Sequence, residues 1–91
     1  MAVIVTKPSQ QVVDQFKYCS TWECNPAVLP TEFREDEYFL WISGEADLDV
    51  EGAERITLHP GDLVLCQKGT RLTWYITTRV KKYYKPLVNM F

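Results

Sequence analysis

A single carboxylate, Glu37, stands at the head of an apolar segment, EYFLWISG, that runs to Gly44. Alternate side chains of a strand share one face, so this segment predicts Glu37 on the same face as Phe39 and Trp41. A carboxyl group among aromatic rings is partly desolvated, which raises its pKa and suits it to proton transfer near neutral pH. Glu37 is therefore the first candidate for chemistry, as an acid, a base or a metal ligand.

Such an acid needs a partner, and Lys82 is the best cationic candidate. In the closing segment RVKKYYKPL, 79–87, alternation places Val80, Lys82 and Tyr84 on one face. We take Glu37, Lys82 and Tyr84 as candidate catalytic residues. The alternative is that Glu37 and Lys82 form a structural ion pair that bridges two strands.

The segment TWEC, 21–24, is a second constellation. Alternation places Trp22 and Cys24 on one face, from which Cys24 can reach a cavity. A nucleophilic cysteine needs a base such as histidine. The only histidine, His59, precedes a predicted turn in TLHPGD, so we expect no Cys–His dyad. With Cys19 and Cys66 the cysteines form an odd set without CxxC spacing, which favours reduced thiols over a disulfide framework or a zinc site.

The elements that must position these residues are mostly strands. The pattern predicts strands at 2–5, 37–43, 45–50, 55–58, 63–67, 71–77 and 79–87. One short helix is predicted within 8–16, and the proline-bounded segment NPAVLP, 25–30, predicts irregular backbone. Short strands between turns and a lone helix favour an all-β sandwich or small barrel, in one domain that covers 1–91.

Composition narrows the classes of partner. The 91 residues carry a net charge of −2, which predicts no bulk attraction to nucleic acid or anionic lipid. No segment approaches the ~20 apolar residues that span a bilayer. The N-terminus MAVIVTKPSQ lacks the features of a signal peptide, so we expect a cytoplasmic protein. A small-molecule or protein partner is favoured, with neither nucleic acid nor membrane.

The spacing of turn residues resembles that of the cupin superfamily. The first cupin motif ends in a Glu, six residues and a Gly, as in EYFLWISG; the second runs from a Gly through five residues to Pro-x-Gly, as in GDLVLCQKG, with Gln67 in place of the proline. The segments KPS, TWEC, SGEADL, HPGDLV, TWYI and RVKKYY look like the small single-domain cupins (cupin type 3) related to the (S)-ureidoglycine aminohydrolase cupin domain. The resemblance implies an all-β, RmlC-like jelly-roll β-barrel with one short N-terminal helix.

Metal-binding cupins carry an HxH pair three or four residues before the Glu, and a further His three residues after the last Gly. The residues at these positions are Thr31 and Phe33, or Pro30 and Glu32, and then Leu72. Only Glu37 matches, and one carboxylate cannot hold manganese, iron or zinc, since useful sites need about three protein ligands. Glu35 and Asp36 cannot both turn inward beside Glu37 on a strand. We therefore expect a degenerate site without a metal or other cofactor.

Without a metal, the predicted interior is an aromatic pocket with a few polar groups, which is the usual composition of a small-molecule site. The candidate ligand-binding residues are Trp22, Cys24, Phe33, Phe39, Trp41, Leu72 and Trp74. For each aromatic residue the competing interpretation is plain core packing.

Three functions stay open at this point. The first is a metal-free cupin that binds a small organic ligand in its barrel. The second is a small-molecule enzyme of the ureidoglycine aminohydrolase-like kind, with Glu37 as acid, base or one metal ligand. The third is a non-catalytic structural or regulatory module with a filled interior. In each case apolar residues such as Val3, Ile4 and Val5 and the C-terminal segment PLVNMF, 86–91, predict a homodimer that pairs through the N-terminal strand and covers sheet edges.

Overall fold

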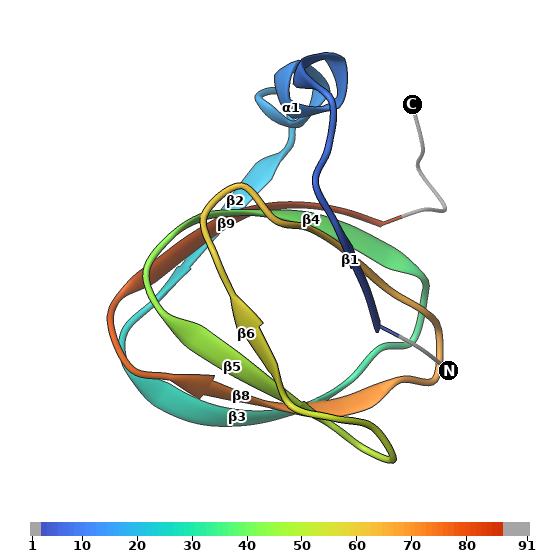
Figure 1. Ribbon diagram of the computed structural model, residues 1–91, viewed down its shortest axis with the longest axis vertical. Coiled ribbons are helices and arrows are strands. Elements are labelled where there is room, and N and C mark those ends of the chain that lie inside the picture. The colour runs from blue at the N-terminus through green and yellow to red at the C-terminus, as the bar shows by residue number, and fades with distance from the viewer. Residues whose placement is uncertain (1–2, 87–91) are drawn as a thin grey trace.

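Two antiparallel sheets form the body of the protein, and the computed structural model describes residues 3–86 (Figure 1). The elements are β1 (Val3–Thr6), α1 (Gln10–Phe16), β2 (Ser20–Cys24), β3 (Ala27–Glu32), β4 (Glu37–Ser43), β5 (Ala46–Val50), β6 (Ile56–Leu58), β7 (Leu63–Cys66), β8 (Arg71–Ile76) and β9 (Val80–Pro86). One sheet has the order β1-β7-β4-β9-β2, and the other has the order β3-β8-β5-β6. This mostly β structure with one short helix confirms the predicted class, whereas closure into a jelly-roll barrel stays a prediction.

The core lies between the two sheets, because inward-facing positions of the strands are apolar. In β8 the burial alternates residue by residue, with Leu72, Trp74 and Ile76 buried. The rings of Trp41 and Trp74 stack with centroids 6.0 Å apart, and the Phe39 ring lies 5.4 Å from Trp74. Aromatic groups from both sheets therefore join in the core, in agreement with the alternation predicted for 37–43.

The helix α1 lies outside the five-stranded sheet and packs against β9 (Figure 1). It begins where the Ser9 side chain accepts a hydrogen bond from the Val12 amide, which satisfies one free N–H of the first turn. The helix buries Phe16, and Leu40 of β4 is buried although it alternates with the core-facing residues of that strand. A small apolar layer thus covers the outer side of this sheet.

The segment 25–30 corrects the sequence prediction, because irregular backbone was expected there and β3 occupies most of it. Among the strands within residues 3–86, β3 pairs only with β8, and Leu29 lies opposite Trp74 while Pro30 lies opposite Thr73. Proline lacks a backbone N–H and is tolerated on an edge strand, where one side of the backbone needs no partner. The edge position explains why Pro30 does not interrupt the strand.

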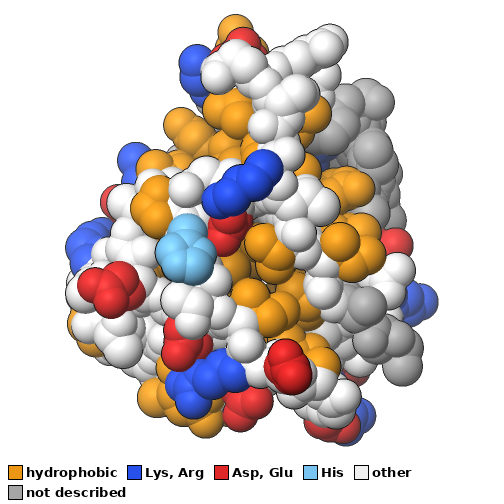
Figure 2. Space-filling model, viewed as in Figure 1, with side chains coloured by type: hydrophobic (Ala, Val, Ile, Leu, Met, Phe, Trp, Pro, Cys, Tyr) orange, Lys and Arg blue, Asp and Glu red, His pale blue; other side chains and the backbone are white. Residues whose placement is uncertain are grey.

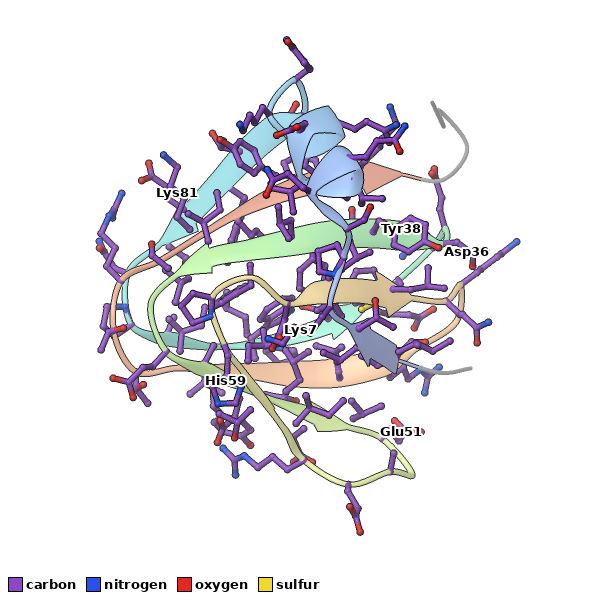
Figure 3. All side chains as sticks on the ribbon, turned by 45° about the horizontal axis from the view of Figure 1, so that its top comes forward. Lys7, Asp36, Tyr38, Glu51, His59 and Lys81 are labelled. Atoms are coloured by element: carbon purple, nitrogen blue, oxygen red, sulfur yellow. The ribbon has the colours of Figure 1, made fainter. Side chains whose placement is uncertain are left out.

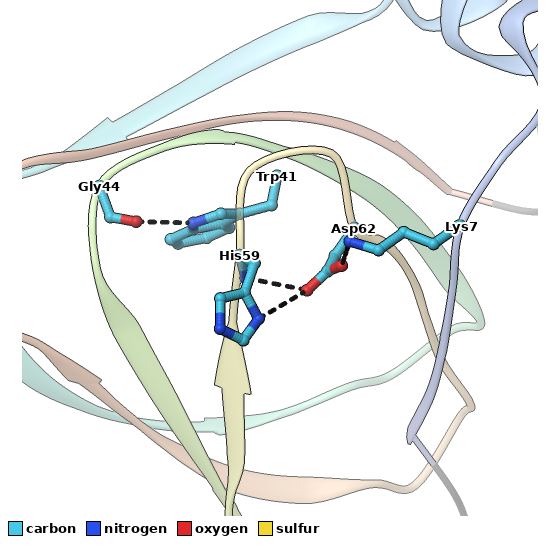
Figure 4. A network of polar contacts seen from close by, with 5 residues as sticks. All are labelled: Lys7, Trp41, Gly44, His59 and Asp62. Atoms are coloured by element: carbon cyan, nitrogen blue, oxygen red, sulfur yellow. Dashed lines mark hydrogen bonds and ion pairs between the residues drawn. The ribbon is translucent and has the colours of Figure 1, made fainter.

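A polar clamp holds the turn at 59–62 against the N-terminal segment (Figure 4). The Asp62 carboxylate, in a residue that is 3% exposed, accepts a hydrogen bond from the Lys7 ammonium and another of 2.8 Å from the His59 amide. Burial alone would raise the pKa of Asp62, but these hydrogen bonds and the charges of Lys7 and His59 together lower it. The backbone of the same turn also forms two hydrogen bonds with the backbone of Trp41. The Gly61 N–H donates to the Trp41 carbonyl, and the Trp41 N–H donates to the Asp62 carbonyl. The clamp therefore fixes the strand that carries Trp41.

Gly44, the residue that closes the first cupin-like motif, is required by a close backbone approach. Its φ is +90°, and a Cβ atom there would collide with the Arg79 carbonyl oxygen and lie 2.8 Å from Val80. The Trp41 indole N–H also donates a 3.0 Å hydrogen bond to the Gly44 carbonyl (Figure 4). The glycine thus allows the turn after β4 to pack onto the start of β9.

Within residues 3–86, no helix has both the length and the apolar character needed to cross a bilayer.

Candidate functional site

A pocket of about 470 Å³ opens between the sheets on the side where β2 and β3 are the edge strands. Three aromatic rings form its walls: Trp22 from β2, Phe33 just after β3 and Trp74 from β8. Glu37 at the start of β4 and Lys82 in β9 supply its inner polar groups. We call this site the Lys82 pocket. The structure thus brings together five of the residues that sequence analysis singled out.

Lys82 sits in an aromatic cage. In the sheet it lies between Trp22 of β2 and Trp41 of β4, and only 6% of the residue is exposed. The Nζ atom is 4.3 Å from the ring centre of Phe39, 4.6 Å from that of Trp74 and 5.0 Å from that of Trp22. Ring faces attract a cation at these distances. The end of the side chain is therefore held by rings.

Burial sets the proton affinity of this amine. Desolvation lowers the pKa of Lys82 below its ordinary value of 10.5, while the charges of Glu37 and Cys66 act in the opposite direction. Burial also raises the pKa of Cys66 to about 12, so its thiol stays neutral at physiological pH. The free amine form of Lys82 is consequently more populated near neutral pH than that of an exposed lysine.

The pKa of Glu37 is shifted in the opposite direction to that of Lys82. Burial raises the pKa of its carboxyl, the charge of Lys82 lowers it, and the charge of Glu35 raises it further, with a net increase above 4.5. No ion pair joins Glu37 to Lys82 within residues 3–86, so the direct structural pair considered from sequence is not formed there. The reason is the register of β4 and β9, which places Glu37 opposite Pro86 and Lys82 opposite Trp41. Both groups face one pocket and interact through it.

The other candidate residues lie around the pocket rather than along its walls. Phe39, Trp41 and Leu72 are buried in the core, and of these the Phe39 ring contacts the Lys82 amino group. Tyr84 packs against the core opposite Phe39. The Cys24 thiol is 3.2 Å from the Asn25 carbonyl oxygen, opposite Val80 at the end of β2.

Several lining residues were not predicted from sequence. Leu29 and Thr31 of β3 line the pocket, and so does Arg34 in the segment between β3 and β4. The signal was the alternation of Ala27, Leu29 and Thr31, which becomes visible once 27–32 is read as a strand. Treating NPAVLP as irregular concealed it.

The residues do not fit the transition metal that many cupins hold. Beside Glu37, the positions of the usual imidazole ligands carry the hydroxyl of Thr31, the ring of Phe33 and the aliphatic side chain of Leu72. Residues 3–86 contain no group of three or more His, Cys, Asp or Glu side chains placed to share a metal. His59 belongs to the Asp62 clamp, and its side chain is mostly exposed. The side chains at these positions therefore do not suit a transition metal.

Comparison with known proteins bears on the fold. The family model described as the EutQ-like cupin domain matches residues 13–84. A DUF861 family protein from Thermotoga maritima superposes with a TM-score of 0.87 at 22% identity, covering 93% of this chain and 99% of that one. The EutQ protein of Clostridium difficile gives 0.64 at 20% identity, covering 72% of this chain and 52% of that one, so the match spans about half of EutQ.

A DUF861 family protein from Pseudomonas syringae gives a TM-score of 0.63 at 26% identity, covering 70% of this chain and 28% of that one. None of the curated proteins matches this chain. At identities near 20% the structural likeness concerns the fold alone. The family match covers most of the chain, and the two glycine-bounded motifs lie inside it, at 37–44 and 61–69. This chain therefore belongs to the EutQ-like cupin domain family.

Proposed function

We propose that this chain binds a small organic molecule in the Lys82 pocket without a resident transition metal. The observation that carries the proposal is a caged, buried amino group that faces an open cavity and pairs with no carboxylate of residues 3–86. A cavity of about 470 Å³ lies within the usual range of small-molecule sites, which are mostly apolar and contain a few polar groups. Aromatic walls with Glu37 and Lys82 have that composition.

The position of the ligand follows from which residues fill the core. Phe39, Trp41 and Leu72 are buried in the core, so the ligand occupies the space between the sheets beside β2 and β3. The third function considered from sequence, a module with a filled interior, has less support because a pocket opens between the sheets beside β2 and β3.

A second candidate function is catalysis of the ureidoglycine aminohydrolase-like kind. The opposite pKa shifts of Glu37 and Lys82 support it, because a raised carboxyl pKa and a lowered amine pKa both move toward neutrality. In that case Glu37 acts as the acid or base. The two candidates share one pocket and differ in whether the ligand leaves chemically changed.

Binding can be measured through the tryptophan indole signals in ¹H–¹⁵N NMR spectra. A panel of small carboxylic acids, amines and aldehydes is added, and a binder is expected to shift the indole signals of Trp22 and Trp74. Thr31→Tyr places a ring in the pocket and should abolish the shifts. Thr73→Tyr, on the opposite face of the neighbouring strand, is the matched control and should retain them. Equal behaviour of the two variants, or shifts confined to surface amides, would contradict the proposal.

We also propose that two copies pair through β1. β1 is an edge strand, and its Ile4 and Val5 are 45% and 37% exposed. Figure 2 shows hydrophobic side chains gathered on the face that carries β1 and β6. Pairing two such edges would satisfy free backbone groups and cover apolar surface.

A further inference from the structure

We propose that Lys82 is an amine nucleophile that condenses with the carbonyl group of a small, uncharged aldehyde or ketone held in the Lys82 pocket. The inference rests on the proposed binding function and adds a ligand class and a covalent step. Desolvated lysines in apolar pockets are the ones that form Schiff bases with carbonyl substrates.

The geometry leaves the amino group available. Within residues 3–86, neither a hydrogen bond nor an ion pair holds the Lys82 Nζ, although the residue is only 6% exposed. Three ring faces hold it in place at the pocket wall instead. A ring face binds the ammonium but does not block the lone pair once the proton has left. The side chain is thus positioned without being committed to a protein acceptor.

The charges around the pocket favour a neutral ligand over an anion. Three acids line it, Glu32, Glu35 and Glu37, against two bases, Arg34 and Lys82. Glu32 also pairs with Arg71, at 3.2 Å, and Glu37 takes part in the step below in its neutral, protonated form, so the lining offers an anion no net positive charge. A neutral carbonyl compound needs no such charge and is compatible with the apolar walls.

The step balances with Glu37 as the proton carrier. The Lys82 lone pair attacks the carbonyl carbon, the carbonyl oxygen takes the proton of the Glu37 carboxyl, and the nitrogen returns a proton to that carboxylate. The carbinolamine then loses its hydroxyl as water after a second protonation by Glu37, and the resulting iminium returns its proton to the Glu37 carboxylate. The net change is C=O plus H₂N–R to C=N–R plus H₂O, and no oxidant or reductant is needed. The raised pKa of Glu37 supports this role, because the protonated form persists to higher pH.

The neighbouring Lys81 provides an internal comparison. Lys81 shares a strand face with Arg79, opposite to the face of Lys82, and lies at the outside of the molecule (Figure 3). Each molecule therefore carries a caged lysine and an ordinary one next to each other, in one peptide segment. Selectivity between the two can be measured without any variant.

The test is trapping with propanal and sodium cyanoborohydride at pH 7, followed by peptide mass mapping. We expect Lys82 to gain the reduced propyl group several times faster than Lys81. The advantage should shrink as the pH rises toward 10.5, the ordinary lysine value, because the lowered pKa then gives Lys82 a progressively smaller excess of free amine. Glu37 of β4 and Cys66 of β7 face Lys82, and with its pKa near 12 the Cys66 thiol contributes little to this profile.

Two variants separate the parts of the proposal. Lys82→Met should remove the fast site and leave Lys81 labelling unchanged, with folding checked by circular dichroism. Glu37→Gln keeps the amine and should slow imine formation several-fold; an unchanged or faster rate would remove Glu37 from the step.

Labelling of Lys82 no faster than that of Lys81 in the unmodified protein would overturn the inference. If propanal still shifts the Trp22 and Trp74 indole signals in that case, binding stands and only the covalent step fails; if no compound of the panel shifts them, the binding function fails as well.

Discussion

Replacing Lys82 by methionine should stabilise the protein at pH 7, because an unbranched apolar side chain can occupy the cage without a charge. Exchange of a buried ion for a hydrophobic residue of similar size is often neutral or stabilising by about 1–4 kcal/mol. The lost attraction to the rings is worth about 0.5–1 kcal/mol per contact at exposed sites, and three rings share one ammonium here. The net expectation is a gain of about 1 kcal/mol in the free energy of unfolding.

The pH dependence of this gain follows from the lowered pKa of Lys82. Between that lowered value and the ordinary value of 10.5, the unfolded chain binds more protons than the folded one. The stability of the unmodified protein therefore rises with pH through this window. The advantage of Lys82→Met should be greatest below the window and shrink as the pH approaches 10.5.

Urea unfolding followed by tryptophan fluorescence, at several pH values, measures both effects. A gain of about 1 kcal/mol also corresponds to a rise of about 4–8 °C in Tm for a domain of this size. Lys81→Met on the outer face is the matched control and should change stability by less than about 0.5 kcal/mol. A loss of 1 kcal/mol or more in Lys82→Met alone would refute the reasoning, because it would mean that the ammonium makes a net stabilising contact.

Four further perturbations test other parts of the structure. Glu37→Gln should raise the free energy of unfolding by about 0.5 kcal/mol at pH 7, because the raised pKa of Glu37 means that its charged form costs stability. Urea titrations should show this gain vanishing below pH 4.5. Asp62→Asn should lose about 1.5–3 kcal/mol at pH 7 through its charge-assisted hydrogen bonds. Its deficit should shrink as the pH falls from 3.8 through the lowered pKa of Asp62, and a deficit independent of pH would argue against the clamp. Gly44→Ala should lower the free energy of unfolding in urea by about 3 kcal/mol. Gly52→Ala should lower it much less, because Gly52 also has a positive φ but a methyl group added there meets no atom within 4 Å. Sedimentation should show a dimer at micromolar concentration that Ile4→Lys converts to a folded monomer, and a monomer before substitution would exclude pairing through β1.

Local alternation was enough to place several site residues correctly. The period of two in 37–43 and 79–87 puts Phe39, Trp41 and Lys82 on inward faces, and the structure has them there. The outer face is placed by the same rule: Tyr38, labelled in Figure 3, lies on the other side of β4 from the core. These predictions succeed because the direction of a strand side chain depends on its immediate neighbours.

Other features depend on contacts between distant segments. β3 was missed because Pro30 argues against a strand, and its tolerance there depends on β3 being an edge strand. Sequence analysis left open whether Glu37 and Lys82 pair directly, because the offset of β4 against β9, with its irregularity between Trp41 and Ser43, is not visible in the sequence. Tyr84 shares a face with Lys82 and yet does not reach the pocket wall, since the pocket opens beside β2 and β3.

The sequence by itself determined the mostly β class, the single short helix, the glycine-bounded cupin motifs and the missing imidazole ligands, because all of these follow from residue type and local spacing. Only the tertiary structure decided that the Lys82 amine sits among Phe39, Trp74 and Trp22, with no carboxylate partner in the described part of the chain. The physical reason is that register and sheet packing bring together side chains from four strands. The desolvation that lowers the pKa of Lys82 arises only from that assembly.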